Sequence, residues 1–238
     1  MGGRSYAAEE PPGQALGVTL ADLIGAPLWG ALLAEGHRRA HRAGDVLLRQ
    51  GDPGTHAFAL AGGVVKVTYT ERDGTVRVLA FRGAGDVVGE AAVARSGAAR
   101  LATVEAISAC AVAVVEKDRF RRFVERHGLS PVLHEHALTR LGESDRARAG
   151  RGGSCERVAQ ALLALVAATG EAAAAAGPGV ELAVTRSDLA QYLGVSRNTV
   201  SARLREIGDG VVSAGRKCVV VHDPAGLRSF ARGGPRNV

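Results

Sequence analysis

Short apolar runs separated by turn-forming residues characterise the first half of the chain. The segments between the runs are rich in Gly, Asp and Pro, which favour tight turns, as in Gly51-Asp52-Pro53-Gly54 and Arg72-Asp73-Gly74. Runs and turns at this regular spacing predict a small β-barrel or sandwich between about residues 40 and 116. The predicted strands contain Val46–Leu48, Phe58–Leu60, Val64–Val67, Val76–Leu79 and Ala111–Val115.

Helical periodicity flanks this β-rich region. Before it, apolar residues recur every three or four positions from residue 19 to residue 35, and Gly25 and Pro27 interrupt them. This pattern predicts two short helices in succession. After the β-rich region, residues 118–124 predict another helix, which should end near Gly128.

A longer helix should follow, because Ser130-Pro131 is a good cap and first turn for a helix that extends to about residue 151. Gly152-Gly153 then provides a hinge, and Ser154 caps a further apolar helix. The alanine-rich residues 171–176 are expected to form a fraying helix end and a loop. The boundary between two domains is therefore predicted near residue 153.

Residues 185–207 have the spacing of a helix-turn-helix. Thr185 caps a first helix, Gly194 allows the sharp turn, and Ser196 caps a second helix. The apolar residues recur at helical intervals on one face of each helix, so that the two helices can pack together. These inward residues are Leu189, Ala190 and Leu193 in the first helix and Val200, Leu204 and Ile207 in the second.

The outward residues of this motif are of the types that bind DNA. Arginine and asparagine side chains can read base edges, and hydroxyl and basic groups can contact phosphates. A β-hairpin with a basic tip, over residues 211–221, is predicted to form a wing beside the motif. The expected base-reading residues are Arg197, Asn198, Ser201 and Ala202. The expected phosphate contacts are Thr185, Arg186, Ser187, Ser196, Thr199, Arg205, Arg216 and Lys217.

Composition agrees with an anionic partner, because the 238 residues carry a formal net charge of +6. Cys110, Cys155 and Cys218 are far apart in the sequence, so we expect neither a metal site nor a disulfide framework. No apolar run approaches the roughly 20 residues of a membrane helix, and a cytoplasmic protein without membrane contact is expected. The absence of the common catalytic motifs argues against an enzyme.

The order of these elements and motifs resembles the cyclic-AMP receptor protein / fumarate-nitrate regulator (CRP/FNR) superfamily of bacterial transcription regulators. The motifs that carry the resemblance are Arg42-Ala43-Gly44-Asp45, Gln50–Gly54, Gly62–Val67, Gly85–Glu90, Arg157–Gln160 and the helix-turn-helix. The resemblance implies an α+β fold with an N-terminal cyclic-nucleotide-binding β-barrel of the jelly-roll type, a long dimerisation helix and a C-terminal winged helix-turn-helix. It gives a tail at residues 1–18, an effector domain at 19–128, the dimerisation helix and hinge at 129–152, and the DNA-binding domain at 153–238.

The resemblance also implies function. A homodimer should bind a near-palindromic double-stranded DNA site, with RNA polymerase as a further partner, and a cyclic nucleotide such as cyclic AMP should act as the allosteric effector. In nucleotide-binding members, residues matching Gly89 and Glu90 open a short helical cassette that holds the ribose and the phosphate, and a residue matching Arg100 neutralises the phosphate. The expected effector-binding residues are Gly89, Glu90, Ala91, Arg100 and Leu101, with Gly142 and Glu143 on the long helix.

Two departures from the family pattern leave open which effector the protein binds and whether it binds one. Leu101 replaces the hydroxyl residue that usually donates to the phosphate, and Gly142 and Glu143 replace a hydroxyl pair that contacts the purine. Another small effector therefore remains an alternative. So does a regulator without a ligand, in which Glu90 and Arg100 pair with each other, and so does a cyclic-nucleotide-binding module that regulates a protein partner.

Overall fold

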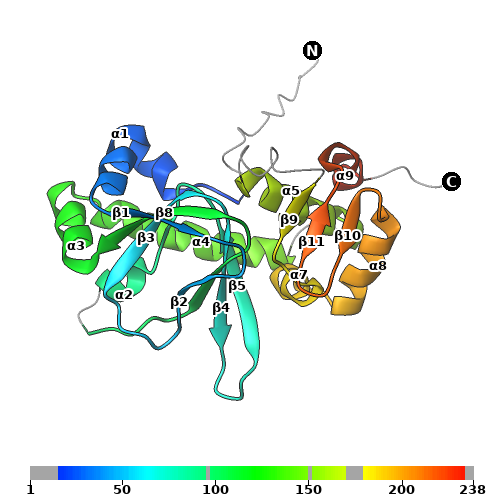
Figure 1. The fold of residues 1–238 in the computed structure, drawn as a ribbon, viewed down its shortest axis with the longest axis horizontal. Helices are drawn as coiled ribbons and strands as arrows, with labels where there is room; N and C mark the ends of the chain where they lie inside the picture. The colour runs from blue at the N-terminus through cyan, green and yellow to red at the C-terminus, as the bar shows by residue number, and fades with distance from the viewer. Residues whose placement is uncertain (1–15, 95–96, 150–151, 170–178, 234–238) are drawn as a thin grey trace, which may run out of the picture.

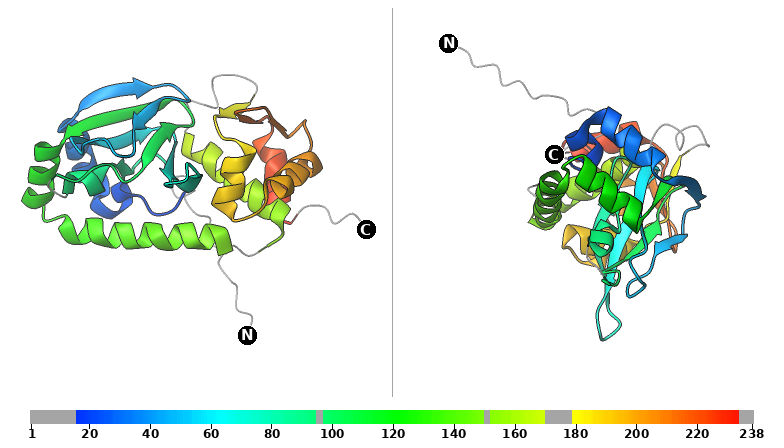
Figure 2. Two further views of the ribbon diagram at one scale, coloured as in Figure 1. Left: turned by 90° about the horizontal axis from the view of Figure 1, so that it is seen from below. Right: turned by 90° about the vertical axis from the view of Figure 1, so that its left-hand side faces the viewer.

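The computed structural model describes residues 16–94, 97–149, 152–169 and 179–233. A β-rich N-terminal part and a mostly helical C-terminal part lie at opposite ends of the molecule (Figure 1). The long helix α4 (Ser130–Ala149) runs along the N-terminal part toward the C-terminal part (Figure 2). The predicted α+β class is confirmed.

The strands of the N-terminal part form two four-stranded sheets. One sheet has the order β1-β8-β3-β6 and the other β2-β7-β4-β5, and the pairs are antiparallel. Apolar side chains from both sheets form one core, which includes Phe58, Leu60, Val65 and Val112. The strands are β1 (His37–His41), β2 (Val46–Leu48), β3 (His56–Gly62), β4 (Val65–Thr70), β5 (Val76–Arg82), β6 (Val87–Val88), β7 (Thr103–Ala106) and β8 (Cys110–Glu116).

This arrangement is of the jelly-roll type, as expected, although the sheets are open and do not close into a barrel. The apolar runs predicted five of the strands. Strands β1, β6 and β7 were missed, because β1 is His-Arg-Arg-Ala-His with four exposed residues and β6 has only two residues.

Helices cover the outer face of the first sheet. Helix α1 (Leu20–Ala34) begins at the capping box of Thr19 and is broken at Gly25, which has φ 79°, so the predicted interruption is confirmed. Helix α2 (Glu90–Ala94) follows β6, and α3 (Lys117–Arg126) follows β8. Leu20, Leu32, Phe120 and Phe123 are buried against this face of the sheet.

The C-terminal part contains the predicted helix-turn-helix beside a small sheet with the order β10-β11-β9. The strand β9 and the last helix, α9, were not predicted. The alanine-rich segment 171–176 and residues 150–151 lie outside the described residues. The elements are α5 (Ser154–Thr169), β9 (Val180–Leu182), α7 (Arg186–Leu193), α8 (Arg197–Ile207), β10 (Val212–Ala214), β11 (Val219–Val221) and α9 (Pro224–Ala231).

Candidate effector pocket and DNA-binding surface

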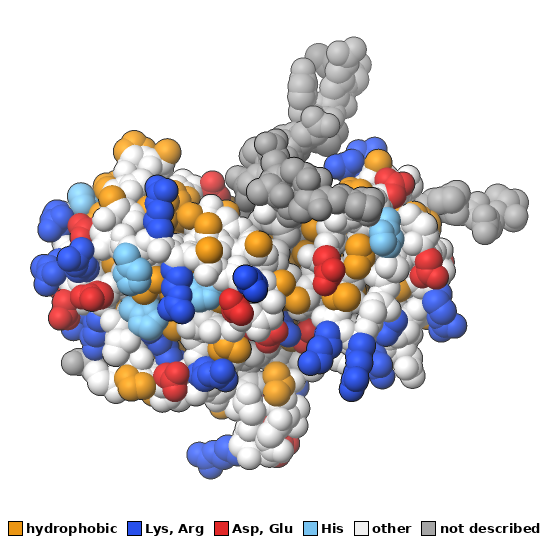
Figure 3. Space-filling view, in the orientation of Figure 1, with side chains coloured by type: hydrophobic (Ala, Val, Ile, Leu, Met, Phe, Trp, Pro, Cys, Tyr) orange, Lys and Arg blue, Asp and Glu red, His pale blue; other side chains and the backbone are white. Residues whose placement is uncertain are grey.

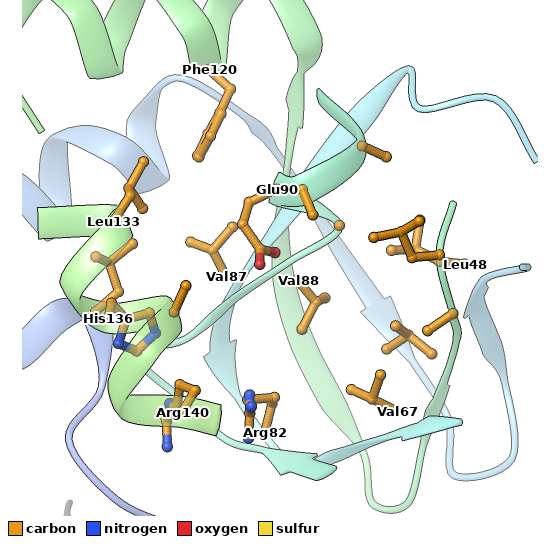
Figure 4. A pocket seen from close by; sticks show the side chains of 18 of the residues that line it. Leu48, Val67, Arg82, Val87, Val88, Glu90, Phe120, Leu133, His136 and Arg140 are labelled. Atoms are coloured by element: carbon orange, nitrogen blue, oxygen red, sulfur yellow. The ribbon is translucent and has the colours of Figure 1, made fainter. Parts of the chain in front are cut away.

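A cavity of about 910 Å³ lies in the N-terminal part, between the second sheet, the α2 cassette and helices α3 and α4. Five of the residues predicted to bind an effector line it: Gly89, Glu90, Ala91, Arg100 and Leu101. Apolar side chains, among them Leu48, Val67 and Leu133, form much of the remaining wall (Figure 4). The cavity thus combines an apolar wall with a few charged groups, as small-molecule sites commonly do.

Gly89 adopts a conformation and a position that exclude a side chain. Its φ is 85°, and a Cβ atom there would lie 2.6 Å from Nη1 of Arg100 and 2.7 Å from Cδ1 of Leu48. The backbone can therefore approach Arg100 closely just before α2 begins at Glu90. This close approach explains why the cassette begins with glycine.

Arg100 is 3% exposed and holds two backbone segments together. Its Nη1 donates to the carbonyl of Gly89 at 2.9 Å, and its Nη2 donates to the carbonyl of His56. Burial lowers the pKa of Arg100, while the nearby carboxylates of Glu90 and Asp52 raise it in part. A guanidinium has five N–H donors, so three remain beyond these two bonds.

The Glu90 carboxyl group projects into the cavity beside Val87 and Val88 (Figure 4). Burial raises the pKa of Glu90, and the positive charges of Arg82 and His136 oppose that rise. Within the described residues no ion pair within 4.0 Å joins Glu90 to Arg100. The alternative in which these two side chains simply pair with each other is therefore not what the structure contains.

The α4 side of the cavity carries charged groups that sequence reasoning missed. Asp86 has no exposed surface, and its carboxylate accepts from Arg140 and lies 3.5 Å from Nε2 of His136. Burial would raise the pKa of Asp86, but the hydrogen bond with His136 and the charge of Arg140 outweigh it, so that the pKa is lowered. Arg82, His136 and Arg140 all line the cavity. Asp86 belongs to a motif noted in the sequence, but its partners on α4 could not be identified from spacing.

Of the two residues predicted on the distal part of α4, the described structure places Gly142. Gly142 is half-buried in α4 and is absent from the cavity wall, and the side chain of Glu143 lies outside the described part. The wall instead receives His134, His136, Ala137 and Arg140 from α4.

The helix-turn-helix has the geometry expected from its spacing. The Thr185 and Asp188 side chains form a capping box at the start of α7, and Gly194 ends α7 in the left-handed region at φ 64°. The Ser196 side chain accepts from the backbone N–H of Thr199 at 3.0 Å and caps α8. All six predicted inward residues are buried.

The predicted DNA contacts lie mostly on the surface. Arg197, Asn198 and Arg205 of α8 are exposed, while Ser201 and Ala202 are half-buried. Arg216 and Lys217 are exposed at the turn between β10 and β11. Lys and Arg side chains gather on the surface over α7 and α8 (Figure 3).

Thr185, Ser187 and Arg186 are all half-buried at the start of α7. Arg186 also makes contacts that the sequence did not reveal. Its Nη2 donates to the carbonyl of Ala214 at 2.6 Å, and its Nη1 to the carbonyl of Gly215 at 3.5 Å. These bonds tie α7 to the β10–β11 hairpin.

Comparison with known proteins supports both parts of the chain. A model of the cyclic nucleotide-binding domain matches residues 38–127, and a model of the Crp-like helix-turn-helix domain matches residues 156–230. The cAMP-activated global transcriptional regulator CRP of Escherichia coli O157:H7 is 26% identical over 197 residues, which span 80% of this chain and 91% of that protein. A probable transcriptional activator of Rhizobium leguminosarum bv. viciae is 31% identical over 180 residues, 72% of each chain.

Solved structures give the same result for the fold. The c-di-GMP-responsive global regulator CLP of Xanthomonas campestris is 25% identical, with a TM-score of 0.56, over 83% of this chain and 99% of that one. FixK2 from Bradyrhizobium japonicum is 23% identical, with a TM-score of 0.55, over 82% and 96%. None of the helices in the described part is both long and apolar enough to span a membrane. With both domains matched in order, the chain belongs to the CRP/FNR superfamily of DNA-binding transcription regulators.

Proposed function

We propose that this regulator acts as a homodimer and that a cyclic nucleotide in the N-terminal cavity controls its binding to specific DNA. The observation that carries the proposal is the cavity of about 910 Å³, with Gly89, Glu90 and Arg100 in its wall, in the same chain as an exposed recognition helix. CRP is described as cAMP-activated and CLP as c-di-GMP-responsive, which supports a cyclic nucleotide as the class of effector.

The chemistry of the cavity suits such a ligand. A ribose hydroxyl can donate to the Glu90 carboxylate, and the cyclic phosphate can accept from the donors that remain on Arg100. Apolar residues can cover the faces of the base. Leu101 is 63% exposed and offers no hydroxyl to the phosphate, so Arg100 and the backbone N–H groups of 89–91 would carry its recognition.

The long helix supports both the dimer and the route from ligand to DNA. Leu138 of α4 is 58% exposed, which suits pairing of α4 with a second copy. Asp86 lies three residues before Gly89, and its carboxylate contacts Arg140 and His136 of α4. A ligand that moves the cassette would therefore also move Asp86 and change its contacts with α4. Two recognition helices would then meet half-sites about one helical turn apart. RNA polymerase is the further partner expected of a cytoplasmic regulator of transcription.

Calorimetric titration of the full chain with cyclic AMP and with cyclic GMP tests the effector. We expect binding of at least one nucleotide, and a loss of about 10-fold or more in Glu90→Gln, because the amide is a weaker acceptor for the ribose hydroxyl. Absence of binding of both would refute cyclic mononucleotide control. A regulator without a ligand, one with another effector, or a module that regulates a protein partner would then have to be considered.

Selection of a binding site from random DNA, followed by fluorescence anisotropy, tests DNA readout. The Arg197 guanidinium matches the two acceptors of guanine, whereas Asn198 suits adenine and Ala202 a thymine methyl group. Arg197→Ala should cost about 1–3 kcal/mol on the selected site and relax one base position. Lys217→Ala should weaken binding to all sequences alike and lower the salt slope by about one. Equal losses for Arg197→Ala on selected and random DNA would contradict base reading.

A further inference from the structure

Strand β5 belongs both to the cavity and to the contact with the helix-turn-helix. Leu79 and Ala80 line the cavity. Val78 and Phe81, which flank them in the sequence, are buried in the apolar cluster that also contains residues of α7 and α8. Figure 1 shows α7 beside this strand. A single strand therefore lies between the proposed nucleotide and the first helix of the DNA-binding motif.

A β-bulge at Leu79 allows β5 to serve both sides. The register of β5 against β4 shifts between Val78 and Ala80, so that Leu79 is an extra residue in the strand. Val78 and Phe81 are three positions apart, and in a regular strand they would lie on opposite faces. The extra residue brings both of them to the α7 side and leaves Leu79 and Ala80 on the cavity side.

On the α7 side, the bulge makes a directed polar contact. The backbone N–H of Val78 donates to Oε1 of Gln191 at 2.7 Å. Nearby, the rings of Phe81 and Tyr192 meet edge to face, with their centroids 4.8 Å apart. A hydrogen bond weakens steeply when the N–H is turned away from its acceptor. The contact with Gln191 therefore depends on the backbone conformation that the bulge gives to β5.

On the cavity side, the bulge aims Leu79 at the space for a ligand. This side chain is 37% exposed, and a nucleotide in the cavity would cover part of its apolar surface. The nucleotide and Gln191 thus favour the same conformation of β5 from opposite faces. Two partners that favour the same conformation strengthen each other's binding, and the effect is reciprocal.

From this arrangement we infer that Gln191 is a positioning residue, through which a nucleotide in the cavity fixes the orientation of the helix-turn-helix in the same subunit. The contact leaves Arg197 and Asn198 of α8 exposed, so it is compatible with DNA binding. A helix-turn-helix that is already oriented loses less freedom when it binds DNA, and its affinity rises. This route through β5 is additional to the route through α4, and it rests on the proposed function because it needs a nucleotide in the cavity.

Fluorescence anisotropy of the full chain on its selected DNA site measures this coupling, without nucleotide and with a saturating concentration of cyclic AMP or cyclic GMP, whichever binds more tightly. The coupling factor is the ratio of the DNA dissociation constants without and with the nucleotide. For the wild type we expect a factor of about 5 or more.

Two variants interrupt the route from its two ends. Gln191→Leu keeps much of the side-chain volume but removes the acceptor, so the factor should fall by about 2- to 5-fold. Gln191→Glu keeps an acceptor and should retain the wild-type factor. Leu79→Ala removes the contact on the cavity side and should also lower the factor. A direct contact of Gln191 with DNA would change both dissociation constants alike and leave their ratio unchanged.

Each end of the route has a matched control. Gln160 is also an exposed glutamine, and its Nε2 donates to the carbonyl of Ala231 at 3.1 Å in the contact between α5 and α9. Gln160→Leu should therefore keep the wild-type factor. So should Arg77→Met, because Arg77 is on β5 but its side chain is 62% exposed and pairs with Glu71 outside the cavity wall. Circular dichroism verifies that each variant is folded.

The outcomes separate the two proposals. If neither nucleotide binds, the proposed effector class fails and the inference fails with it. If a nucleotide binds and changes DNA affinity, but Gln191→Leu keeps the wild-type factor, the inference alone is overturned. The inference is also overturned if the nucleotide weakens DNA binding, if Gln191→Glu falls as far as Gln191→Leu, or if Gln160→Leu loses as much.

Discussion

Glu90 combines a buried carboxyl group with a position where a ligand hydroxyl is expected. Burial raises the pKa of this carboxyl in the free protein, so it holds a proton to a higher pH than an exposed glutamate. A ribose hydroxyl donates to the ionised form and favours it, which lowers the pKa in the complex. Ligand binding should therefore release a proton, and affinity should rise with pH until free Glu90 is fully ionised.

The pH dependence of ligand binding tests this linkage. We expect the affinity of the wild-type protein for its nucleotide to rise with pH, by at most about 10-fold per pH unit while Glu90 titrates, and then to level off. Calorimetry in two buffers with different ionisation enthalpies measures the released proton directly. Glu90→Gln should show a flatter profile and a smaller release. The same slope in both proteins would assign the titration to a group other than Glu90.

At the scale of elements, α7 and the wing are joined through Arg186. The guanidinium donates to the carbonyls of Ala214 and Gly215, so it fixes the hairpin against the start of α7. These two carbonyls need a fork rather than a point charge. Arg186 is thus a positioning residue for Arg216 and Lys217 at the tip, in addition to the phosphate contact expected from the sequence.

Salt titrations of DNA binding distinguish the two roles. If Arg186 mainly positions the wing, both Arg186→Met and Arg186→Lys should weaken binding, because neither replaces the fork. If it mainly contacts a phosphate, Arg186→Lys should bind like the wild type, and Arg186→Met should lower the salt slope by about one. We expect the first pattern, with Lys217→Met as the control that lowers the slope.

The elements predicted correctly from the sequence carry local signals. Thr185, Gly194 and Ser196 mark the ends of α7 and α8 through their own backbone and capping preferences, which depend little on the rest of the fold. Strand β1 carries no such signal, because it is a basic, mostly exposed strand at the edge of its sheet, where it pairs with β8 alone among the described strands. The same limit applies to the pocket. The Gly89–Glu90 motif is local, whereas the approach of Asp86 to Arg140 spans 54 positions and depends on how α4 packs.

At the scale of the molecule, the two domains share one core. Val64, Val78, Phe81 and Ile107 of the N-terminal part are buried in the same apolar cluster as the helix-turn-helix. Polar contacts surround this cluster: the backbone N–H of Val78 donates to Oε1 of Gln191 at 2.7 Å, and that of Ala183 donates to the Ile107 carbonyl at 2.7 Å. The interface therefore holds α7 in a defined orientation against β5.

Lys66 is a buried cation at this interface, 3.4 Å from Glu105 and 3.3 Å from Asp188. Lys66→Met leaves the carboxylates of Glu105 and Asp188 without this cation, and we expect the free energy of unfolding to fall by about 2 kcal/mol. Trp29, the single tryptophan, reports on the N-terminal part, and circular dichroism reports on all helices. Their denaturation curves should coincide in the wild type and separate in Lys66→Met. Coincident curves and an unchanged midpoint in the variant would contradict coupling through Lys66, and Arg77→Met serves as the control.

The shared core also limits how the protein can be recombined. Exchange of sensor domains between relatives assumes that each domain brings its own complete interior. Here a DNA-binding half separated near residue 153 would leave uncovered the apolar surface that Val64, Val78, Phe81 and Ile107 normally bury. A chimaera that gives this sensor a new DNA target would therefore have to carry a matching α7 surface, so that specificity for the operator and fit to the sensor must be engineered together.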